Sequence, residues 1–341
     1  MDGNPFVCVT TDAVEPDLNW EQEHYAEAGV DYRIHTLRQA SPQAIIKAAS
    51  MAHVLVVDQA KITSEVIQGL TQCRLIIRHG DGFDNLDVEA ARRHGILCAN
   101  EPGFWSKEAA EQAFALGMAL ALRLPLQEKV ARRPTGTGSG WNLQHIMPYS
   151  GLASQTVGLL GCGKIGQHAL SLYKAVAHRV LVHDPGLTPG EIQALGATPV
   201  SFDQLLIQSD ILSIHVPATQ GTIGLFNAQT LGHMKKGAIL INTARGSIVD
   251  TEALVHALES GHLGGAGLDS TLPEPLPENH RLFHCSNVII TPHMAWYSED
   301  ALARIRKQIV TDVLACKRGE LPAHPLNPDV LETPQSRWKK A

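Results

Sequence analysis

The sequence of 341 residues lacks several features that mark particular classes of protein. Its 28 Lys and Arg do not outnumber its 34 Asp and Glu, and they are scattered, so no basic surface for nucleic acid or anionic lipid is indicated. No apolar stretch approaches the span of a bilayer, and Met1 to Asn4 lacks the basic and apolar character of an export signal. We therefore expect neither a nucleic-acid nor a membrane partner.

Cysteine is also scarce, and its distribution indicates a cellular compartment. The six cysteines lie far apart with no CxxC pair, and several fall within apolar runs, where a thiol behaves as a small hydrophobe. This usage suits a reducing cytosol, so we expect a cytoplasmic protein, and we expect no metal site. The cysteines are Cys8, Cys73, Cys98, Cys162, Cys285 and Cys316.

With 44% hydrophobic and 18% charged residues, the composition is typical of a globular protein. A length of 341 residues is enough for two domains with separate hydrophobic cores. Short β-rich segments alternate with helix-like stretches in two series, which predicts an α/β chain with parallel sheets and a cleft for a small ligand. The predicted strands are Phe6 to Thr10, Tyr32 to Thr36, His53 to Asp58, Arg74 to Arg78, Ile96 to Ala99, Thr156 to Leu160, Val180 to His183, Ile211 to Val216, Ala238 to Asn242, Gly265 to Asp269 and Val288 to Thr291.

The segments outside these two series predict helices, a loop and a tail. The Ala- and Leu-rich stretch from Ser106 to Leu124 predicts a long buried helix that Pro125 ends. The glycine-containing stretch at 132–150 predicts a surface loop or subunit arm. A further helix is expected at 298–317, followed by a polar, proline-spaced tail.

A glycine-rich turn directly follows the predicted strand at 156–160 and opens a predicted helix, which is the context of a dinucleotide-binding loop. There Gly161 permits a tight turn, Gly163 lets the backbone approach a pyrophosphate, and Gly166 lets helix and strand pack closely. The helix start, with Lys164 and Ile165, offers free N–H groups to the phosphates. The segment predicts a bound dinucleotide.

Asp184 follows the next predicted strand, where a dinucleotide-binding fold places the carboxylate that accepts from the ribose hydroxyls. A carboxylate there repels the 2′-phosphate of NADP, so Asp184 predicts NAD as the cofactor. By itself, Asp184-Pro185 is equally typical of a simple turn. The preceding glycines favour the ribose contact.

Three segments of the second half resemble the D-isomer-specific 2-hydroxyacid dehydrogenase family in their order and spacing. They are Asn242-Thr243-Ala244-Arg245-Gly246, Asp269 through Pro273-Glu274-Pro275, and Thr291-Pro292-His293. The likeness extends from about Arg74 to Leu321. With Trp296, the segment after the histidine is similar to the branch that contains the C-terminal-binding-protein corepressors and their bacterial relatives.

The resemblance implies two Rossmann-like doubly wound parallel-sheet domains, with a central NAD-binding domain inserted in a flavodoxin-like substrate domain. It places the substrate domain at 1–101 and 294–330 and the NAD domain at 102–293. It also implies a homodimer, NAD as cofactor, and hydride transfer between nicotinamide C4 and C2 of a small 2-oxo or 2-hydroxy acid. The polar, proline-spaced composition of 331–341 predicts a disordered tail.

By motif position, the resemblance makes Arg245, Glu274 and His293 the catalytic set. Reduction of a ketone needs a proton donor at the carbonyl oxygen and a cation for the neighbouring carboxylate. His293 suits the first role, with Glu274 orienting its ring, and the planar guanidinium of Arg245 suits the second. Taken singly, Arg245 also suits a helix cap, Glu274 a loop acid and His293 a structural histidine.

The segment Gly80-Asp81-Gly82 predicts a turn whose successive N–H groups bind the substrate carboxylate, with Arg78 assisting. A plain glycine turn is the ordinary alternative. Asp81 departs from what such a site favours, because a carboxylate beside an anionic substrate is unfavourable unless it faces away or meets a polar group.

Other residues are expected around the substrate and along the cofactor. Trp105 and Trp296 are predicted to shape the pocket for the substrate side chain, or else to fill the core or a dimer interface. Gln112 stands where the family commonly has a histidine, and its effect is open. The resemblance places six residues along the cofactor: His215, Pro217, Thr222, Thr243, Ala244 and Asp269. It implies that Asp269 accepts a hydrogen bond from the nicotinamide carboxamide.

The sequence therefore favours an enzyme that reduces a 2-oxo acid with NADH or oxidises the D-2-hydroxy acid. The alternative from another class is an NAD(H)-sensing scaffold with little turnover, like the corepressor relatives. The intact catalytic set and the lack of a basic DNA-directed segment favour the enzyme. Formate or phosphite oxidation fits less well, because formate enzymes lack the Glu-His pair and the phosphite-type sequence around the histidine differs.

Overall fold

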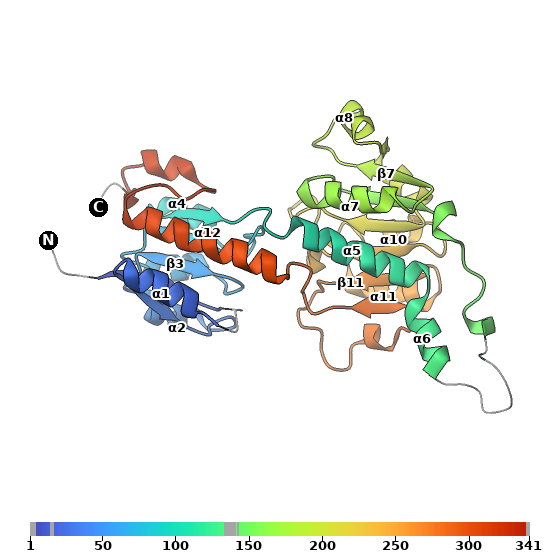
Figure 1. Cartoon of the computed structure of the whole chain (residues 1–341), viewed down its shortest axis with the longest axis horizontal. Helices are drawn as coiled ribbons and strands as arrows, with labels where there is room; N and C mark the ends of the chain where they lie inside the picture. Colours follow the sequence, from blue (N-terminus) through green and yellow to red (C-terminus); the bar gives the residue numbers. More distant parts are fainter. Residues whose placement is uncertain (1–4, 14–16, 133–140, 142, 339–341) are drawn as a thin grey trace. The chain divides into compact units, whose positions relative to one another are not determined.

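The computed structural model of the chain describes residues 5–13, 17–132, 141 and 143–338, which fold into two units (Figure 1). The first unit combines the two chain ends, Met1–Phe104 and Glu299–Ala341, and the second is the continuous segment Trp105–Ser298. The second unit thus extends a few residues beyond the predicted end of the NAD domain and begins a few residues after its predicted start.

The first unit contains a five-stranded parallel sheet with the strand order β2-β1-β3-β4-β5. Every residue of its last three strands is buried, because a parallel sheet is covered by helices on both faces. This is the flavodoxin-like order, in which ligands bind outside the carboxyl ends of the strands. The strands are β1 (Phe6–Thr10), β2 (Val30–Ile34), β3 (Val54–Val57), β4 (Leu75–Arg78) and β5 (Leu97–Asn100).

Five helices cover this sheet. Three of them, α2, α3 and α4, share one apolar core with the strands, and their starts are capped by Ser41, Thr63 and Asp87, which accept from backbone N–H groups in the first turn. The C-terminal helix α12 returns to contact α1 and β3 (Figure 1). The helices are α1 (Asn19–Glu27), α2 (Pro42–Ala49), α3 (Ser64–Gly69), α4 (Val88–Arg93) and α12 (Glu299–Lys317), with a 3-10 turn η5 (Pro328–Glu332).

The segment after η5 differs from the predicted disordered tail. Up to residue 338 it is folded on the first unit, where the Arg337 guanidinium donates to the carbonyl oxygens of Leu70 and Cys73. A polar composition did not reveal this docking, because the acceptors lie in a distant part of the sequence. Residues 339–341 lie outside the described part of the chain.

The second unit contains a seven-stranded parallel sheet with the order β12-β11-β10-β9-β6-β7-β8. Counted from β6, this is the Rossmann order extended by one strand, and its switch point lies between β6 and β9. The two-residue edge strand β8 is absent from the sequence-based prediction. The strands are β6 (Thr156–Leu160), β7 (Arg179–His183), β8 (Thr198–Pro199), β9 (Ile211–Ile214), β10 (Ile239–Asn242), β11 (Gly265–Leu268) and β12 (Val288–Ile290).

Helices cover both faces of the second sheet and create two cores. Leu159 and Ile241 pack towards α5, α7 and α8, whereas their neighbours Leu160 and Leu240 pack towards α9, α10 and α11, as the two-residue period of a strand requires. The unit is therefore doubly wound. Its helices are α5 (Ser106–Ala121), α6 (Leu124–Arg132), α7 (Lys164–Lys174), α8 (Pro189–Ala194), α9 (Phe202–Gln208), α10 (Ala228–His233) and α11 (Thr251–Glu259), with 3-10 turns η1 (Leu143–His145), η2 (Leu152–Ser154), η3 (Gly246–Ile248) and η4 (Arg281–His284).

The structure corrects the single helix predicted up to Leu124. Helix α5 ends at Ala121, Arg123 has a φ of 53°, and Pro125 lies in the first turn of α6. Proline is compatible with a first turn, where its missing N–H has no intrahelical acceptor, so Pro125 begins a helix instead of ending one. Part of the predicted arm, 133–140 and 142, lies outside the described residues.

None of the helices in the described residues combines the length and the apolarity needed to cross a bilayer. Within the same residues, no group of three His, Cys, Asp or Glu side chains is arranged to hold a metal ion. All six cysteines are free, and burial raises the pKa of the Cys73 thiol to about 12. The buried thiols therefore act as neutral, small side chains in the cores.

Candidate active site

The glycine loop between β6 and α7 shows which of its glycines the fold itself requires. Gly161 has a φ of 91°, and a side chain there would meet the His215 carbonyl oxygen at 2.8 Å. A side chain on Gly166 would collide with the Gly161 carbonyl oxygen. Gly163 has an ordinary φ of −70°, and no atom lies within 4 Å of its Cβ position. The open space at Gly163 fits the close approach of a dinucleotide pyrophosphate.

The start of α7 is also suited to an anion. Gly163 is its N-cap residue, no side chain caps the helix, and its first turn contains no acidic residue. The first N–H groups, with Lys164 and Ile165 in this turn, therefore point out of the helix start without a capping side chain. The residues present fit the phosphates of a dinucleotide.

Asp184 lies at the carboxyl end of β7, beside the glycine loop. Its Oδ2 accepts from the Cys162 N–H at 2.6 Å, and its Oδ1 accepts from the Gly186 N–H at 2.8 Å. The structure thus brings Asp184 to the loop, as a ribose-binding role requires. The ribose contact itself stays a prediction.

The turn after β9 borders the same loop at the switch point. His215 Nε2 lies 2.9 Å from Ser213 Oγ, and burial lowers the pKa of the His215 ring to about 4, so the ring is neutral. The hydroxyl of Thr222 donates to the Pro217 carbonyl oxygen at 2.6 Å, which closes the turn. These three predicted cofactor residues, His215, Pro217 and Thr222, therefore form one compact segment.

The predicted catalytic residues follow three neighbouring parallel strands. Arg245 comes after β10, Glu274 after β11 and His293 after β12, and these strands are adjacent in the sheet. Their carboxyl ends share one edge, which is where open α/β sheets bind ligands. His293 Nδ1 lies 2.8 Å from Glu274 Oε1, and the two side chains are only 23% and 34% exposed. The structure thus brings together the second and third motifs of the set, as the predicted orienting role of Glu274 requires.

Asn242 holds the backbone at Arg245, a role that the sequence did not reveal. Its side chain is buried, accepts from the Ala244 N–H at 3.1 Å and donates to the Arg245 carbonyl oxygen at 2.9 Å. The Arg245 guanidinium in turn donates to the Ala244 carbonyl oxygen at 2.9 Å. The only signal for Asn242 was its place at the start of the Asn-Thr-Ala-Arg-Gly motif. The cofactor contacts of Thr243 and Ala244 stay predictions.

Asp269 binds donors of the protein itself. Its Oδ1 accepts from the Thr291 hydroxyl at 2.6 Å and from the Met294 N–H at 2.9 Å, while its Oδ2 accepts from the Ala295 N–H at 2.9 Å. The carboxylate is buried and holds the turn that carries His293. Its predicted contact with the nicotinamide carboxamide stays a prediction.

The two predicted pocket tryptophans meet each other. The rings of Trp105 and Trp296 are 6.1 Å apart between centroids and meet edge to face, and Trp296 also contacts Tyr297. The Ser298 hydroxyl donates to Glu108 Oε1 at 2.7 Å, which ties this turn to α5. Both tryptophans therefore lie beside the turn of His293.

The predicted substrate loop belongs to the first unit, where its charged groups have protein partners. Arg78 is buried, and its Nη1 lies 3.4 Å from Asp58 Oδ1. Gly80 has a φ of 139°, and its N–H donates to the Arg78 carbonyl oxygen. Asp81 Oδ1 accepts from the Gly103 N–H at 2.5 Å. This gives one carboxylate oxygen of Asp81 a donor within the protein. The substrate contacts of this loop, Gly82 included, stay predictions.

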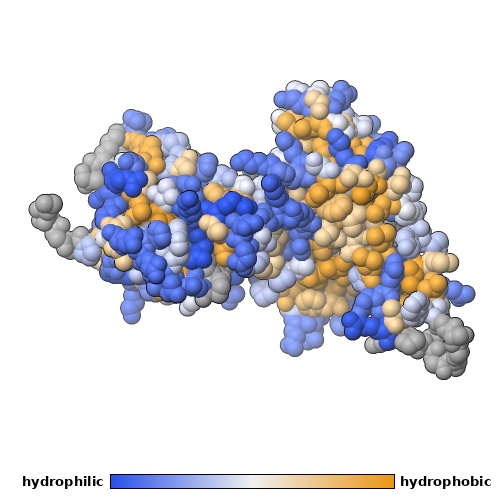
Figure 2. All heavy atoms as spheres, viewed as in Figure 1, coloured by the Kyte–Doolittle hydropathy of each residue, from blue (hydrophilic) through white to orange (hydrophobic). Residues whose placement is uncertain are grey.

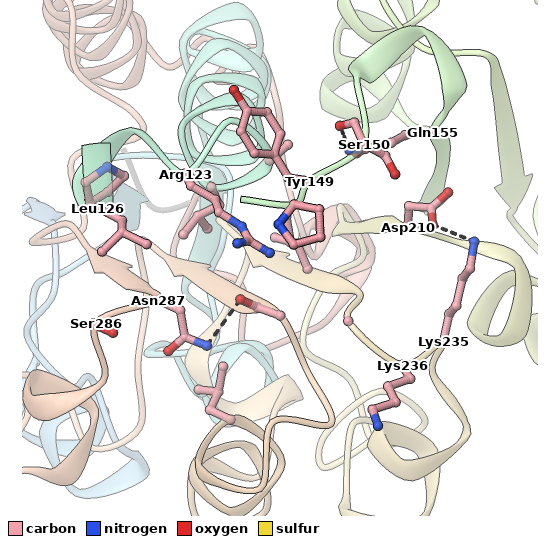
Figure 3. Close-up of a pocket in the computed structure, with 18 residues that line it drawn as sticks. Arg123, Leu126, Tyr149, Ser150, Gln155, Asp210, Lys235, Lys236, Ser286 and Asn287 are labelled. Atoms are coloured by element: carbon pink, nitrogen blue, oxygen red, sulfur yellow. Dashed lines mark hydrogen bonds and ion pairs between the residues drawn. The ribbon is translucent and has the colours of Figure 1, made fainter. Parts of the chain in front are cut away.

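A separate cavity of about 740 Å³ lies at the opposite, amino edge of the second sheet. Its lining includes Gln155, Asp210, Gly264 and Asn287, which immediately precede strands or lie at their starts. Figure 3 shows the ion pair between Asp210 and Lys235 on its wall, at 2.6 Å. Because the glycine loop and the predicted catalytic residues lie at the carboxyl edge, this cavity is not the candidate active site.

Comparison with known proteins identifies the family of the chain. Residues 116–295 match the model of the NAD-binding domain of D-isomer-specific 2-hydroxyacid dehydrogenases. Over 273 residues the chain is 34% identical to a glyoxylate reductase of Thermococcus litoralis, covering 80% of this chain and 82% of that protein. The chain belongs to the D-isomer-specific 2-hydroxyacid dehydrogenase family.

Further relatives of this dehydrogenase agree with the family. A D-3-phosphoglycerate dehydrogenase of Synechocystis sp. is 38% identical over 278 residues, which are 80% of this chain but 49% of that protein, so this chain spans about half of its length. The solved D-lactate dehydrogenase of Aquifex aeolicus, complexed with NAD and lactic acid, has a TM-score of 0.81 and 29% identity, covering 92% of this chain and 96% of that one. The dehydrogenase is an NAD-dependent oxidoreductase acting on the CH–OH group of 2-hydroxy acids. Its likeness to the corepressor branch stays a prediction.

Proposed function

We propose that this dehydrogenase interconverts a small 2-oxo acid and its D-2-hydroxy acid, with His293 as general acid and base, Glu274 orienting His293, and Arg245 binding the substrate carboxylate or carbonyl. The observation that carries the proposal is the 2.8 Å hydrogen bond between His293 Nδ1 and Glu274 Oε1. The position of Arg245 after the neighbouring strand β10 supports it.

The proposed chemistry follows from these groups. Glu274 holds the Nδ1 side of the ring, so Nε2 is the atom that gives a proton to the carbonyl oxygen in reduction and removes it in oxidation. Bound NAD(H) supplies or accepts the hydride at nicotinamide C4. The guanidinium of Arg245 binds the planar 2-oxo carboxylate and offsets the charge that builds up on the carbonyl oxygen.

The proposal extends to the substrate side chain through Trp105 and Trp296. Two edge-to-face rings offer apolar contact area but no cation. We therefore favour a substrate with a small apolar side chain over a phosphorylated one, although relatives are named for both glyoxylate and 3-phosphoglycerate.

The test is turnover with NADH across glyoxylate, pyruvate, 2-oxobutyrate and 3-phosphohydroxypyruvate. We expect activity with at least one of these acids, a loss of roughly a hundredfold or more in His293→Ala, and a smaller loss in Glu274→Gln. His284→Ala, which removes an exposed histidine of the same unit, serves as the matched control and should keep full activity. Absence of turnover in a protein that binds NADH would overturn the proposal and favour the NAD(H)-sensing scaffold.

We also propose that the functional form is a homodimer. From the start of α6 to the segment before β6, the second unit exposes large apolar side chains. Figure 2 shows apolar residues on the visible face of this unit. Monomers rarely leave such patches uncovered, so a second copy is the occupant that we propose. The exposed side chains are Leu124, Trp141, Leu143, Met147 and Tyr149.

Light scattering coupled to size exclusion tests this assembly. For the wild type we expect twice the mass of one chain, which is 36.9 kDa. The double variant Trp141→Ser and Met147→Ser should shift towards the mass of a single chain. A wild-type protein with the mass of one chain would refute the dimer. The cytoplasmic location stays a prediction.

A further inference from the structure

The backbone at His293 has an unusual conformation. His293 has a φ of 56°. Among the described residues, Arg123 is the only other non-glycine residue with a positive φ. A residue with a side chain adopts this left-handed region only at a free-energy penalty, and it persists where surrounding contacts enforce it. The contacts around His293 therefore determine where its ring lies.

Two sets of hydrogen bonds enforce this conformation. On one side, the His293 N–H donates to the Thr291 carbonyl oxygen at 3.0 Å. On the other side, the N–H groups of Met294 and Ala295 both donate to the buried carboxylate of Asp269. His293 is thus held between Thr291 and Asp269.

Thr291 and Asp269 are joined to each other by a hydrogen bond, and a further one joins Thr291 to Gln112 on α5. The Thr291 hydroxyl lies 2.6 Å from Asp269 Oδ1 and 3.2 Å from Gln112 Nε2. A hydroxyl has one proton, which it must give to the carboxylate, so Gln112 must donate its N–H to the hydroxyl oxygen. The direction of the chain from Gln112 through Thr291 to Asp269 is therefore determined.

We propose that Gln112 is a positioning residue for the reaction, acting through Thr291 and Asp269 on the turn that holds His293. The inference rests on the proposed role of His293 as the proton-transferring group. Gln112 anchors the hydroxyl of Thr291 from α5, so that this hydroxyl points at Asp269 and the carboxylate keeps its two backbone donors in place. Loss of this anchor moves the ring relative to the substrate and leaves the glycine loop between β6 and α7 untouched.

Three substitutions distinguish positioning from general stability. Gln112→Leu keeps the bulk of the side chain but removes the donor, and we expect kcat to fall on the order of tenfold with KM and the Kd for NADH nearly unchanged. Gln112→His restores a ring N–H donor and should recover most of kcat. Gln112→Glu offers an acceptor that competes for the Thr291 proton, so it should be as impaired as Gln112→Leu.

Thr291→Val provides an independent measure of the same chain. Its effect on kcat should resemble that of Gln112→Leu, and the double variant should be little worse than either single variant, because both remove one connected set of bonds. Glu111→Gln changes the exposed neighbour of Gln112 on α5 and is the matched control.

The outcomes separate this inference from the proposed function. If His293→Ala abolishes turnover but Gln112→Leu retains wild-type kcat, the positioning role is wrong and the proposed function stands. If Gln112→Leu lowers kcat only together with the melting temperature and NADH binding, and Gln112→His does not rescue it, Gln112 is a structural residue. If His293→Ala retains activity, the proposed function itself fails.

Discussion

The first unit contains a buried pair of acidic side chains that should make its stability depend on pH. Glu101, in the turn after β5, is 0% exposed, and its neighbour Asp312 on α12 is 2% exposed. Asp312 accepts from the Gln308 amide at 2.9 Å and from the Ala323 N–H at 3.2 Å. Burial, and next the charge of Asp312, raise the pKa of Glu101 to about 9. At neutral pH Glu101 therefore keeps its proton beside Asp312.

The sign and size of the effect follow from this pKa. The ordinary value is 4.5, so the folded protein holds the proton more tightly than the unfolded chain does. The resulting stabilisation is complete below the unfolded pKa and is lost as the pH rises through the folded pKa. Between about pH 7 and about pH 9, Glu101 should lower the free energy of unfolding by about 2 kcal/mol. Glu101→Gln keeps the shape of the side chain and cannot ionise, so it should remove this loss.

Urea unfolding of the wild type and Glu101→Gln across this pH range measures the effect. The free energy of unfolding of the variant relative to the wild type should rise with pH, by about 2 kcal/mol over the interval. Glu27→Gln, an exposed acid on α1 of the same unit, is the matched control and should run parallel to the wild type. A constant difference in the free energy of unfolding between wild type and Glu101→Gln at all pH values would refute the raised pKa of Glu101.

Three further predictions concern the cofactor and the substrate. Asp184→Ala should narrow the preference for NADH over NADPH in kcat/KM, and equal use of both cofactors by the wild type would contradict the role of Asp184. Gly163→Val meets no protein atom at its Cβ position, so calorimetry should find NADH binding weakened by tenfold or more while the melting temperature is nearly unchanged, and intact binding would remove Gly163 from the phosphate site. Trp105→Ala and Trp296→Ala should redistribute kcat/KM among 2-oxo acids of increasing size, and unchanged ratios would place these rings away from the substrate.

The parts of the fold that the sequence predicts are those set by local patterns. The strand at 156–160 has the same bounds in the structure, because a buried apolar run followed by glycine is a signal contained in a few residues. The two doubly wound sheets are confirmed for the same reason. By contrast, Arg337 contacts Leu70 and Cys73, and Glu101 lies beside Asp312. Both contacts join segments more than 200 residues apart in the sequence. No local pattern marks such contacts, and composition alone made the Arg337 segment a disordered tail.

Asp269 shows why a motif locates a residue without revealing its partners. In the sheet, Leu268 of β11 pairs with Ile290 of β12, so the next residues, Asp269 and Thr291, lie side by side at the carboxyl edge. A shift of this register by one residue would turn the two side chains to opposite faces. The motif places a carboxylate after β11, but only the register determines that it meets the Thr291 hydroxyl and the turn of His293. Helix α5 then places Gln112 within hydrogen-bond distance of Thr291. The position of His293, the proposed proton-transferring group, therefore depends on both strand pairing and helix packing.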